Sequence, residues 1–164
     1  MTHQQWIAQC IELALDNVAR GQAPFAALVV RDGTVLGQGV NDVRATGDLV
    51  GHAEVRALQA AARHVDSRHL TGCVLYTSCE PCPMCLGAIY WSGIEAVYYG
   101  LSVAEQAEFD DLPQRQYAEI CGTAKDRRMR LVQAKPAELD PRRPFLAGAR
   151  GTRPGKGDQP DTSR

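Results

Sequence analysis

The chain has 164 residues, of which 45% are hydrophobic, so it is long enough to bury one sizeable core. Its net charge of −1 excludes a strong overall attraction to nucleic acids or to membrane surfaces. The charge is unevenly spread, because residues 1–122 hold seven Lys/Arg against fourteen Asp/Glu and residues 123–164 hold eleven against five. This asymmetry indicates either an anionic partner or a solvated tail, and the tail is the simpler interpretation.

The N-terminal segment has neither a basic region nor an apolar run of the signal-peptide kind. No apolar stretch approaches the length that crosses a bilayer. We therefore expect a soluble, cytoplasmic protein with reduced cysteines.

The first third of the chain predicts a helix followed by a β-hairpin. Thr2 and Gln5 form a capping-box pattern, and Gly21 ends the helix. An apolar run predicts a buried strand over 24–31, and Asp32-Gly33 is a hairpin turn signal before a return strand over 34–40. Asn41 follows this strand at the start of a polar loop, where a ligand contact or a plain turn residue is expected.

Helices and strands alternate in the middle of the chain, which predicts parallel strands joined by crossovers. Helices are expected over 52–65, 83–92, 102–108, 114–120 and 138–148, and strands over 73–77, 96–100 and 129–134. Gly, Pro, Thr, Asp and Arg dominate from residue 148 onward. We therefore predict one domain over 1–147 and a flexible tail over 148–164.

Two cysteines and a histidine have the spacing of a zinc site. Cys82 and Cys85 are three apart, so a helix would place both sulfurs on one face. Pro83 fits the first helical position, which makes Cys82 the cap residue. His52 supplies a nitrogen ligand, and three ligands of these types leave a tetrahedral Zn²⁺ one position for water.

Glu54 lies two residues after His52 and is not needed as a ligand. Residues two apart inside a helix point in different directions, so both can share a site only if His52 lies in the first turn. A carboxylate at this place suits general acid–base catalysis.

Two structural alternatives remain. Cys79 could join His52, Cys82 and Cys85 in a closed Cys₃His cage without water, as in a zinc-stabilised scaffold or binding module. A disulfide between Cys82 and Cys85 is the other, although it is uncommon without export. The other cysteines are read as buried or half-buried thiols, namely Cys10, Cys73, Cys79 and Cys121.

The combination His-x-Glu with Pro-Cys-x-x-Cys resembles the signature of the zinc-dependent nucleobase deaminases. The chain is similar to the cytidine-deaminase-like superfamily over residues 1 to about 147. The run from Tyr76 to Trp91 resembles the small zinc-dependent bacterial guanine deaminases. The resemblance implies a three-layer α/β/α fold around a five-stranded mixed sheet of order 2-1-3-4-5, one Zn²⁺ per chain and a homodimer.

The same resemblance implies hydrolysis of guanine to xanthine and ammonia. Phe109-Asp110-Asp111 is similar to the acidic motif that this branch uses to hold guanine, and we assign Asp111 as the acceptor with Asp110 as the alternative. The Asn41 side chain can both donate and accept hydrogen bonds at the edge of a purine. Phe25 either stacks on the base or is a plain aromatic residue of the core. Ala53 is assigned to the substrate site with the motif that contains it.

Three other substrates fit the same motifs: guanosine, the adenosine of a tRNA and another aminated ring. Binding of tRNA needs a continuous cationic face on a folded element, and here much of the positive charge lies in the Gly/Pro-rich tail, so a nucleic-acid partner is not expected. In known guanine deaminases the C-terminal segment closes the partner's site with an aromatic residue. This chain has no aromatic residue after Phe145.

Overall fold

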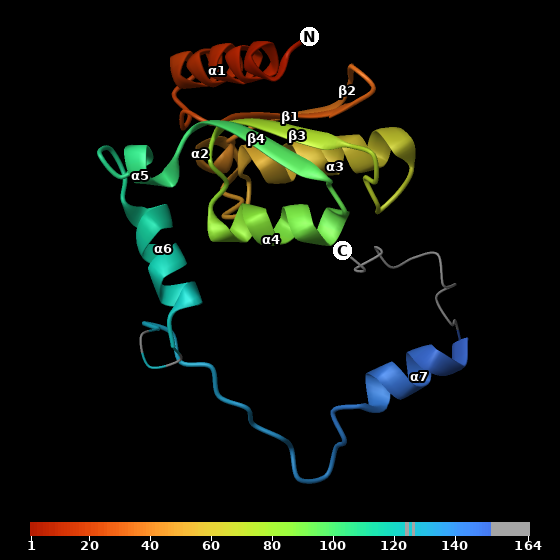
Figure 1. Cartoon of the computed structure of the whole chain (residues 1–164). Coiled ribbons are helices and arrows are strands. Elements are labelled where there is room, and N and C mark those ends of the chain that lie inside the picture. Colours follow the sequence, from red (N-terminus) through yellow and green to blue (C-terminus); the bar gives the residue numbers. More distant parts are fainter. Residues whose placement is uncertain (124, 126, 152–164) are drawn as a thin grey trace. The chain divides into compact units, whose positions relative to one another are not determined.

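The computed structural model describes residues 1–123, 125 and 127–151, which fall into two units (Figure 1). The first unit spans Met1–Cys121 and the second begins at Gly122. The predicted domain boundary at residue 147 lies inside helix α7 (Arg143–Gly151), and most of the predicted tail lies outside the described residues. No helix in these described ranges is long and apolar enough to span a bilayer.

The first unit is built on a mixed sheet of four strands in the order β2-β1-β3-β4. Strand β1 runs antiparallel to both of its neighbours, whereas β3 and β4 are parallel, as the alternation of elements predicts. Asp32 and Gly33 join β1 to β2 with positive φ angles of 50° and 74°, which confirms the predicted hairpin turn. The strands are β1 (Ala26–Arg31), β2 (Thr34–Val40), β3 (Val74–Cys79) and β4 (Ala96–Leu101).

Helices cover both faces of this sheet, which is the expected α/β/α layering (Figure 1). Helix α1 (His3–Ala19) covers one face, and its Thr2–Gln5 capping box forms as predicted. Helices α3 (Ala53–Val65) and α4 (Pro83–Ser92) cover the other face. Three shorter helices complete the unit: α2 (Val43–Thr46), α5 (Val103–Gln106) and α6 (Leu112–Cys121).

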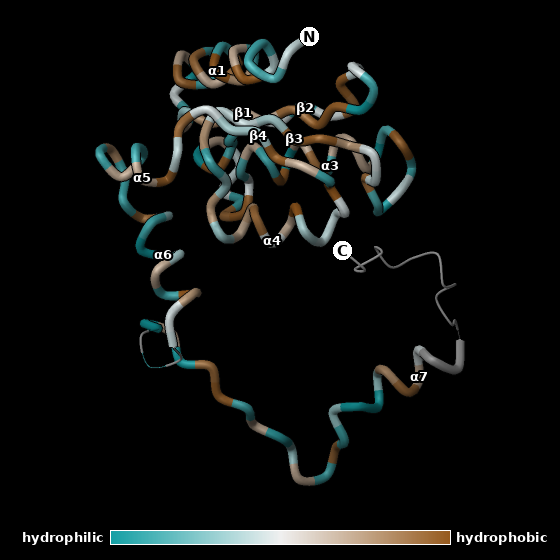
Figure 2. The backbone as a smooth tube through the Cα atoms, viewed as in Figure 1, coloured by the Kyte–Doolittle hydropathy of each residue, from teal (hydrophilic) through white to brown (hydrophobic). Residues whose placement is uncertain are grey.

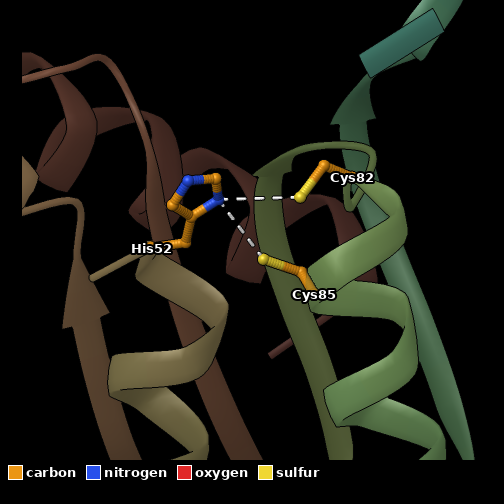
Figure 3. Close-up of side chains that lie close together, drawn as sticks. All are labelled: His52, Cys82 and Cys85. Carbon is orange, nitrogen blue, oxygen red and sulfur yellow. Dashed lines mark hydrogen bonds between the residues drawn. The ribbon is translucent and has the colours of Figure 1, made fainter. Parts of the chain in front are cut away.

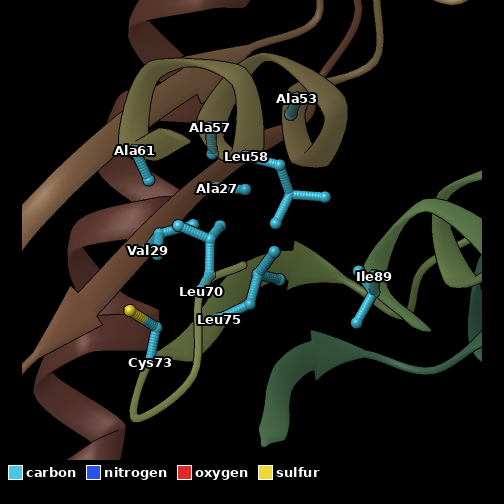
Figure 4. Close-up of a cluster of buried hydrophobic side chains, with 10 residues drawn as sticks. All are labelled: Ala27, Val29, Ala53, Ala57, Leu58, Ala61, Leu70, Cys73, Leu75 and Ile89. Carbon is cyan, nitrogen blue, oxygen red and sulfur yellow. The ribbon is translucent and has the colours of Figure 1, made fainter. Parts of the chain in front are cut away.

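The central strands are buried on both faces, so successive side chains enter two separate cores. Leu28 and Val30 of β1 pack with Trp6 and Cys10 beneath α1. The alternate side chains of β1 belong to the larger core beneath α3 and α4 (Figure 4), whose members are Ala27, Val29, Ala53, Ala57, Leu58, Ala61, Leu70, Cys73, Leu75 and Ile89.

Helix α3 lies unusually close to strand β2 because glycines and alanines form their contact. A Cβ atom on Gly39 would meet the backbone of Ala53 and Ala57, and one on Gly37 would meet Ala57 and Ala61. Small residues on both elements therefore let two backbones approach each other. This contact fixes the start of α3, where His52 and Glu54 lie.

The predicted fifth strand is not confirmed among the residues that the structure describes. Residues 129–134 have no regular secondary structure and pair with no strand among the described residues. Met129, Leu131 and Val132 of this run are exposed, and the backbone tube is partly brown in this part of the chain (Figure 2). A short apolar run becomes a strand only where a neighbouring strand edge supplies backbone partners.

Candidate active site

His52 occupies the residue just before helix α3, as the prediction required. Its backbone is extended (φ −79°, ψ 153°), and its carbonyl accepts a hydrogen bond from the Arg56 N–H at 2.9 Å. Glu54 is then the second helical residue. The change of backbone direction between the cap and the helix lets two residues that are only two apart enter one site.

The loop that leads to His52 is closed by an ion-pair cluster. Arg56 binds Asp42 through Nε and Nη2, and Nη2 also contacts Asp48 at 2.8 Å. The Asp42 N–H donates to the Gly51 carbonyl at 3.0 Å. Because Asp42 follows Asn41 and Gly51 precedes His52, this cluster couples the two ends of the loop.

Cys82 caps helix α4 and Pro83 begins it, as the sequence predicts. The His52 Nδ1 atom lies 3.6 Å from the Cys82 sulfur and 3.5 Å from the Cys85 sulfur (Figure 3). At usual Zn–N and Zn–S bond lengths, a tetrahedral ion holds such atoms about 3.5 Å apart. The three side chains therefore fit Zn²⁺, and they are the group of possible metal ligands that the described residues form.

The protonation of the sulfurs also suits a metal. The neighbouring Cys85 side chain and His52 ring lower the pKa of Cys82, which favours the thiolate form that a metal binds. The proximity of Cys82, together with burial, raises the pKa of Cys85. A thiol loses its proton when it coordinates a metal, so both sulfurs can act as ligands.

Glu54 is a buried carboxylate held in place by two neighbours. Its Oε1 atom accepts from the Thr77 hydroxyl at 3.3 Å, and its Oε2 atom accepts from the Cys85 thiol at 3.4 Å. Burial raises the pKa of Glu54. A carboxyl placed beside the metal ligands is positioned to accept a proton and to return it.

These groups open onto a cavity of about 350 Å³. This volume suits one small planar ring system. The cavity is lined by Phe25, Asn41, Leu49, His52, Glu54, Cys79, Glu80, Cys82, Met84, Gln106, Asp110, Leu112, Pro113 and Gln116.

Most of the substrate contacts expected from the sequence lie at this cavity. Asn41 and Phe25 both line it, and Asn41 is buried, with its Oδ1 atom accepting from the Val43 N–H at 3.3 Å. Ala53 differs, because its side chain belongs to the core beneath α3. It could reach a ligand only through a backbone N–H of the first helical turn.

The two adjacent acids lie differently in the structure. Asp110 lines the cavity, whereas Asp111 is not among its lining residues. Asp111 is half-exposed and pairs with Arg115 one turn later in α6, at 3.0 Å. The start of α6 directs Asp111 to this (i, i+4) ion pair, so the geometry favours Asp110, the alternative of the two, for a contact with a ligand.

Several residues at the site were not predicted from the sequence. Gln106 and Glu80 line the cavity, Thr77 holds Glu54, and the Tyr117 hydroxyl donates to the Pro81 carbonyl at 2.7 Å, next to the metal ligands. Thr77 and Glu80 could have been found from the sequence, because they lie in the same motif as Cys82. Gln106 and Tyr117 lie on later helices and belong to no such motif.

The other cysteines do not complete a closed cage. Cys79 lines the cavity but does not belong to the metal-ligand group, and burial raises the pKa of its thiol to about 11. All six cysteines are free, so the Cys82–Cys85 disulfide is absent. Cys10 and Cys73 are buried as expected, but Cys121 is exposed.

Comparisons with known proteins agree with this geometry. The cytidine and deoxycytidylate deaminase zinc-binding region matches residues 1–101. Guanine deaminase of Bacillus subtilis is 40% identical over 136 residues, which cover 81% of this chain and 86% of that protein. Its X-ray structure aligns with a TM-score of 0.86 and 36% identity over 97% of this chain and 100% of that chain.

A guanine deaminase from Nitrosomonas europaea aligns with a TM-score of 0.60 and 32% identity over 65% of this chain and 63% of that one. The sequence match, the structural match and the His52, Cys82 and Cys85 group point to one conclusion. The chain belongs to the cytidine and deoxycytidylate deaminase zinc-binding family, and guanine deaminase of B. subtilis is its homologue.

Proposed function

We propose that this chain is a zinc-dependent hydrolase that converts guanine to xanthine and ammonia. The observation that carries the proposal is the placement of Glu54 beside the His52, Cys82 and Cys85 group, at a cavity of about 350 Å³. The relatives named as guanine deaminases support the choice of substrate.

His52, Cys82 and Cys85 would hold the metal through one nitrogen and two sulfurs. When bound by three protein ligands, Zn²⁺ lowers the pKa of a water in the fourth position to about 7 and so supplies a nucleophile. A non-catalytic scaffold would not need Glu54, which is buried, acidic and open to the cavity.

Glu54 moves the protons of the reaction. It takes one proton from the attacking water and delivers it to ring N3. It then takes the remaining proton from the new hydroxyl group on C2 and passes it to the amino group, which leaves as ammonia while C2=O forms. The Thr77 hydroxyl holds one carboxylate oxygen during these transfers. General acid–base catalysis of this kind contributes roughly 10²–10⁴-fold.

The cavity walls supply the groups that recognise a base. The Asp110 carboxylate accepts from ring N–H donors, the buried Asn41 amide offers polar contacts, and Phe25 provides an apolar wall. Ala53 contributes through its backbone at the start of α3.

Ammonia release over a panel of guanine, guanosine, cytosine and adenine tests the proposal. We expect turnover of guanine and poor turnover of adenine, because adenine presents an unprotonated N1 to the Asp110 carboxylate. Guanine and guanosine share this edge, so the panel also decides between them. Turnover of guanosine with none of guanine would overturn the free-base assignment.

We also propose that the chain forms a homodimer in the cytoplasm. The support on this chain is the end of helix α4, where Tyr90 and Trp91 are 77% and 88% exposed. Adjacent exposed aromatics of this size are typical of interaction surfaces.

A further inference from the structure

We infer that Gln106 reads the substituent at C6 of the purine and thereby selects 6-oxo rings. This inference rests on the proposed function and adds a recognition residue to it. The Gln106 side-chain amide donates to the C6 carbonyl oxygen, while Asp110 accepts from the neighbouring N1–H.

Gln106 is a largely buried residue in the wall of the cavity. It is only 6% exposed and lines the cavity. Its backbone forms the hydrogen bonds of the helical turn that leads to Asp110. A side-chain amide in a cavity wall can donate a hydrogen bond to a ligand and accept one from it.

The fold places Gln106 and Asp110 next to each other. The Asp110 N–H donates to the Gln106 carbonyl at 2.9 Å, so the two residues are one turn apart at the end of α5. Both line the same cavity. The Asp110 Oδ1 atom accepts from the Leu112 N–H at 3.0 Å, which leaves Oδ2 available to a ligand.

An amide beside a carboxylate matches a lactam edge. The N1–H and C6=O groups of guanine present a donor next to an acceptor, and a carboxylate at neutral pH can only accept. A second group must therefore donate to the C6 oxygen, and the Nε2 atom of Gln106 can do so.

Two other amides line the cavity. Asn41 uses its Oδ1 atom in the turn that follows β2, where it accepts from the Val43 N–H, and its Nδ2 atom remains a donor. Gln116 is half-buried in α6. Gln106 differs from both because it lies one turn before Asp110, the residue that accepts from the neighbouring N1–H in this inference.

The inference is tested by ligand binding, which is independent of turnover. Hypoxanthine carries the N1–H and C6=O edge but has no 2-amino group to lose, and unsubstituted purine lacks that edge. We expect calorimetry on the zinc-loaded enzyme to show about a hundredfold tighter binding of hypoxanthine than of purine, about tenfold from each of the two contacts. Equal affinities in the wild-type enzyme would overturn the inference whatever any variant does.

Two variants then assign the preference to Gln106. Gln106→Met keeps the length of the side chain and removes the donor, so the preference for hypoxanthine should fall by about tenfold while purine binding changes little. Gln106→Glu places a second carboxylate opposite the C6 oxygen and should weaken hypoxanthine binding at least as much. Gln114→Met, at an exposed position in α6 outside the cavity, is the matched control and should leave the preference intact.

The outcomes separate this inference from the proposed function. If the wild-type enzyme turns over guanine but Gln106→Met keeps the full preference for hypoxanthine, the role of Gln106 is wrong and the function stands. If hypoxanthine is preferred through Gln106 but guanine is not turned over, the recognition role stands and the proposed reaction is wrong.

Discussion

A substitution at Glu54 can distinguish metal binding from catalysis. Glu54→Gln keeps the shape of the side chain but cannot accept a proton, so the variant should retain one zinc per chain and lose at least about 10²-fold in kcat for guanine. Metal analysis and ammonia release on the same preparation check this. Full activity in the variant would remove Glu54 from the mechanism, and loss of zinc would show a role in holding the metal.

The adjacent acids give a second prediction at the residue scale. Asp110→Asn should lower kcat/KM for guanine by about tenfold or more, because a charged hydrogen bond is worth about 1.5–3 kcal/mol. Asp111→Asn should have little effect, because its exposed ion pair with Arg115 lies outside the cavity. Steady-state kinetics of the two variants side by side decides between the acids, and the reverse order would restore Asp111 as the acceptor.

The residues that could be predicted are those whose chemistry depends on local spacing. His52, Cys82 and Cys85 were predicted from their positions at helix starts and from the three-residue separation of the two cysteines. The backbone geometry of a helix start fixes the directions of side chains at such positions. The difference between Asp110 and Asp111 depends on the residue at which α6 begins, and that boundary was predicted two residues too late. Gln106 was missed because burial of one polar residue on a short helix leaves no periodic signal.

At the scale of elements, the contact between α3 and β2 controls where the site begins. Gly39→Ala would place a methyl group against the backbone of Ala53 and Ala57, which cannot move away as a side chain can. Overpacking of this kind costs about 1–3 kcal/mol in the free energy of unfolding. Because Ala53 lies between His52 and Glu54, zinc affinity should fall together with stability.

Gly87→Ala is the matched control for this prediction. Gly87 lies inside α4 with open space where its Cβ atom would go, so alanine there should stabilise the fold by about 0.5–1 kcal/mol. Because Gly87 shares a helix face with Tyr90 and Trp91 of the proposed dimer surface, both variants are compared in the Trp91→Glu background. Urea denaturation and zinc titration of both variants test the pair. Equal stability of Gly39→Ala and its parent chain would show that the two backbones can separate at no cost.

Elements governed by short-range chemistry were predictable and those that need a distant partner were not. The Thr2 capping box, the Asp32-Gly33 turn and the Pro83 helix start all depend on neighbours in sequence, and all three are confirmed. The run over 129–134 has the composition of a strand, but no strand edge pairs with it among the described residues. The glycine–alanine contact also escaped prediction, because small residues give no hydrophobic periodicity.

At the scale of the whole molecule, the exposed aromatics of α4 predict self-association. Trp91→Glu would place a charge within the proposed dimer surface and should shift the chain to a monomer at micromolar concentration. Gln9→Glu adds the same charge at an exposed position of α1 and serves as the control. Analytical ultracentrifugation measures the oligomeric state of each variant. A wild-type monomer at that concentration would contradict the dimer proposal.

The exposure of Cys121 makes the chain suitable for selective labelling. The other five thiols are buried or half-buried, and two of them would be held by zinc. A maleimide dye added to the metal-loaded enzyme should therefore attach at one position, at the junction where the first unit ends. Fluorescence anisotropy of that dye would then measure its rotational freedom at this one position without any engineered cysteine.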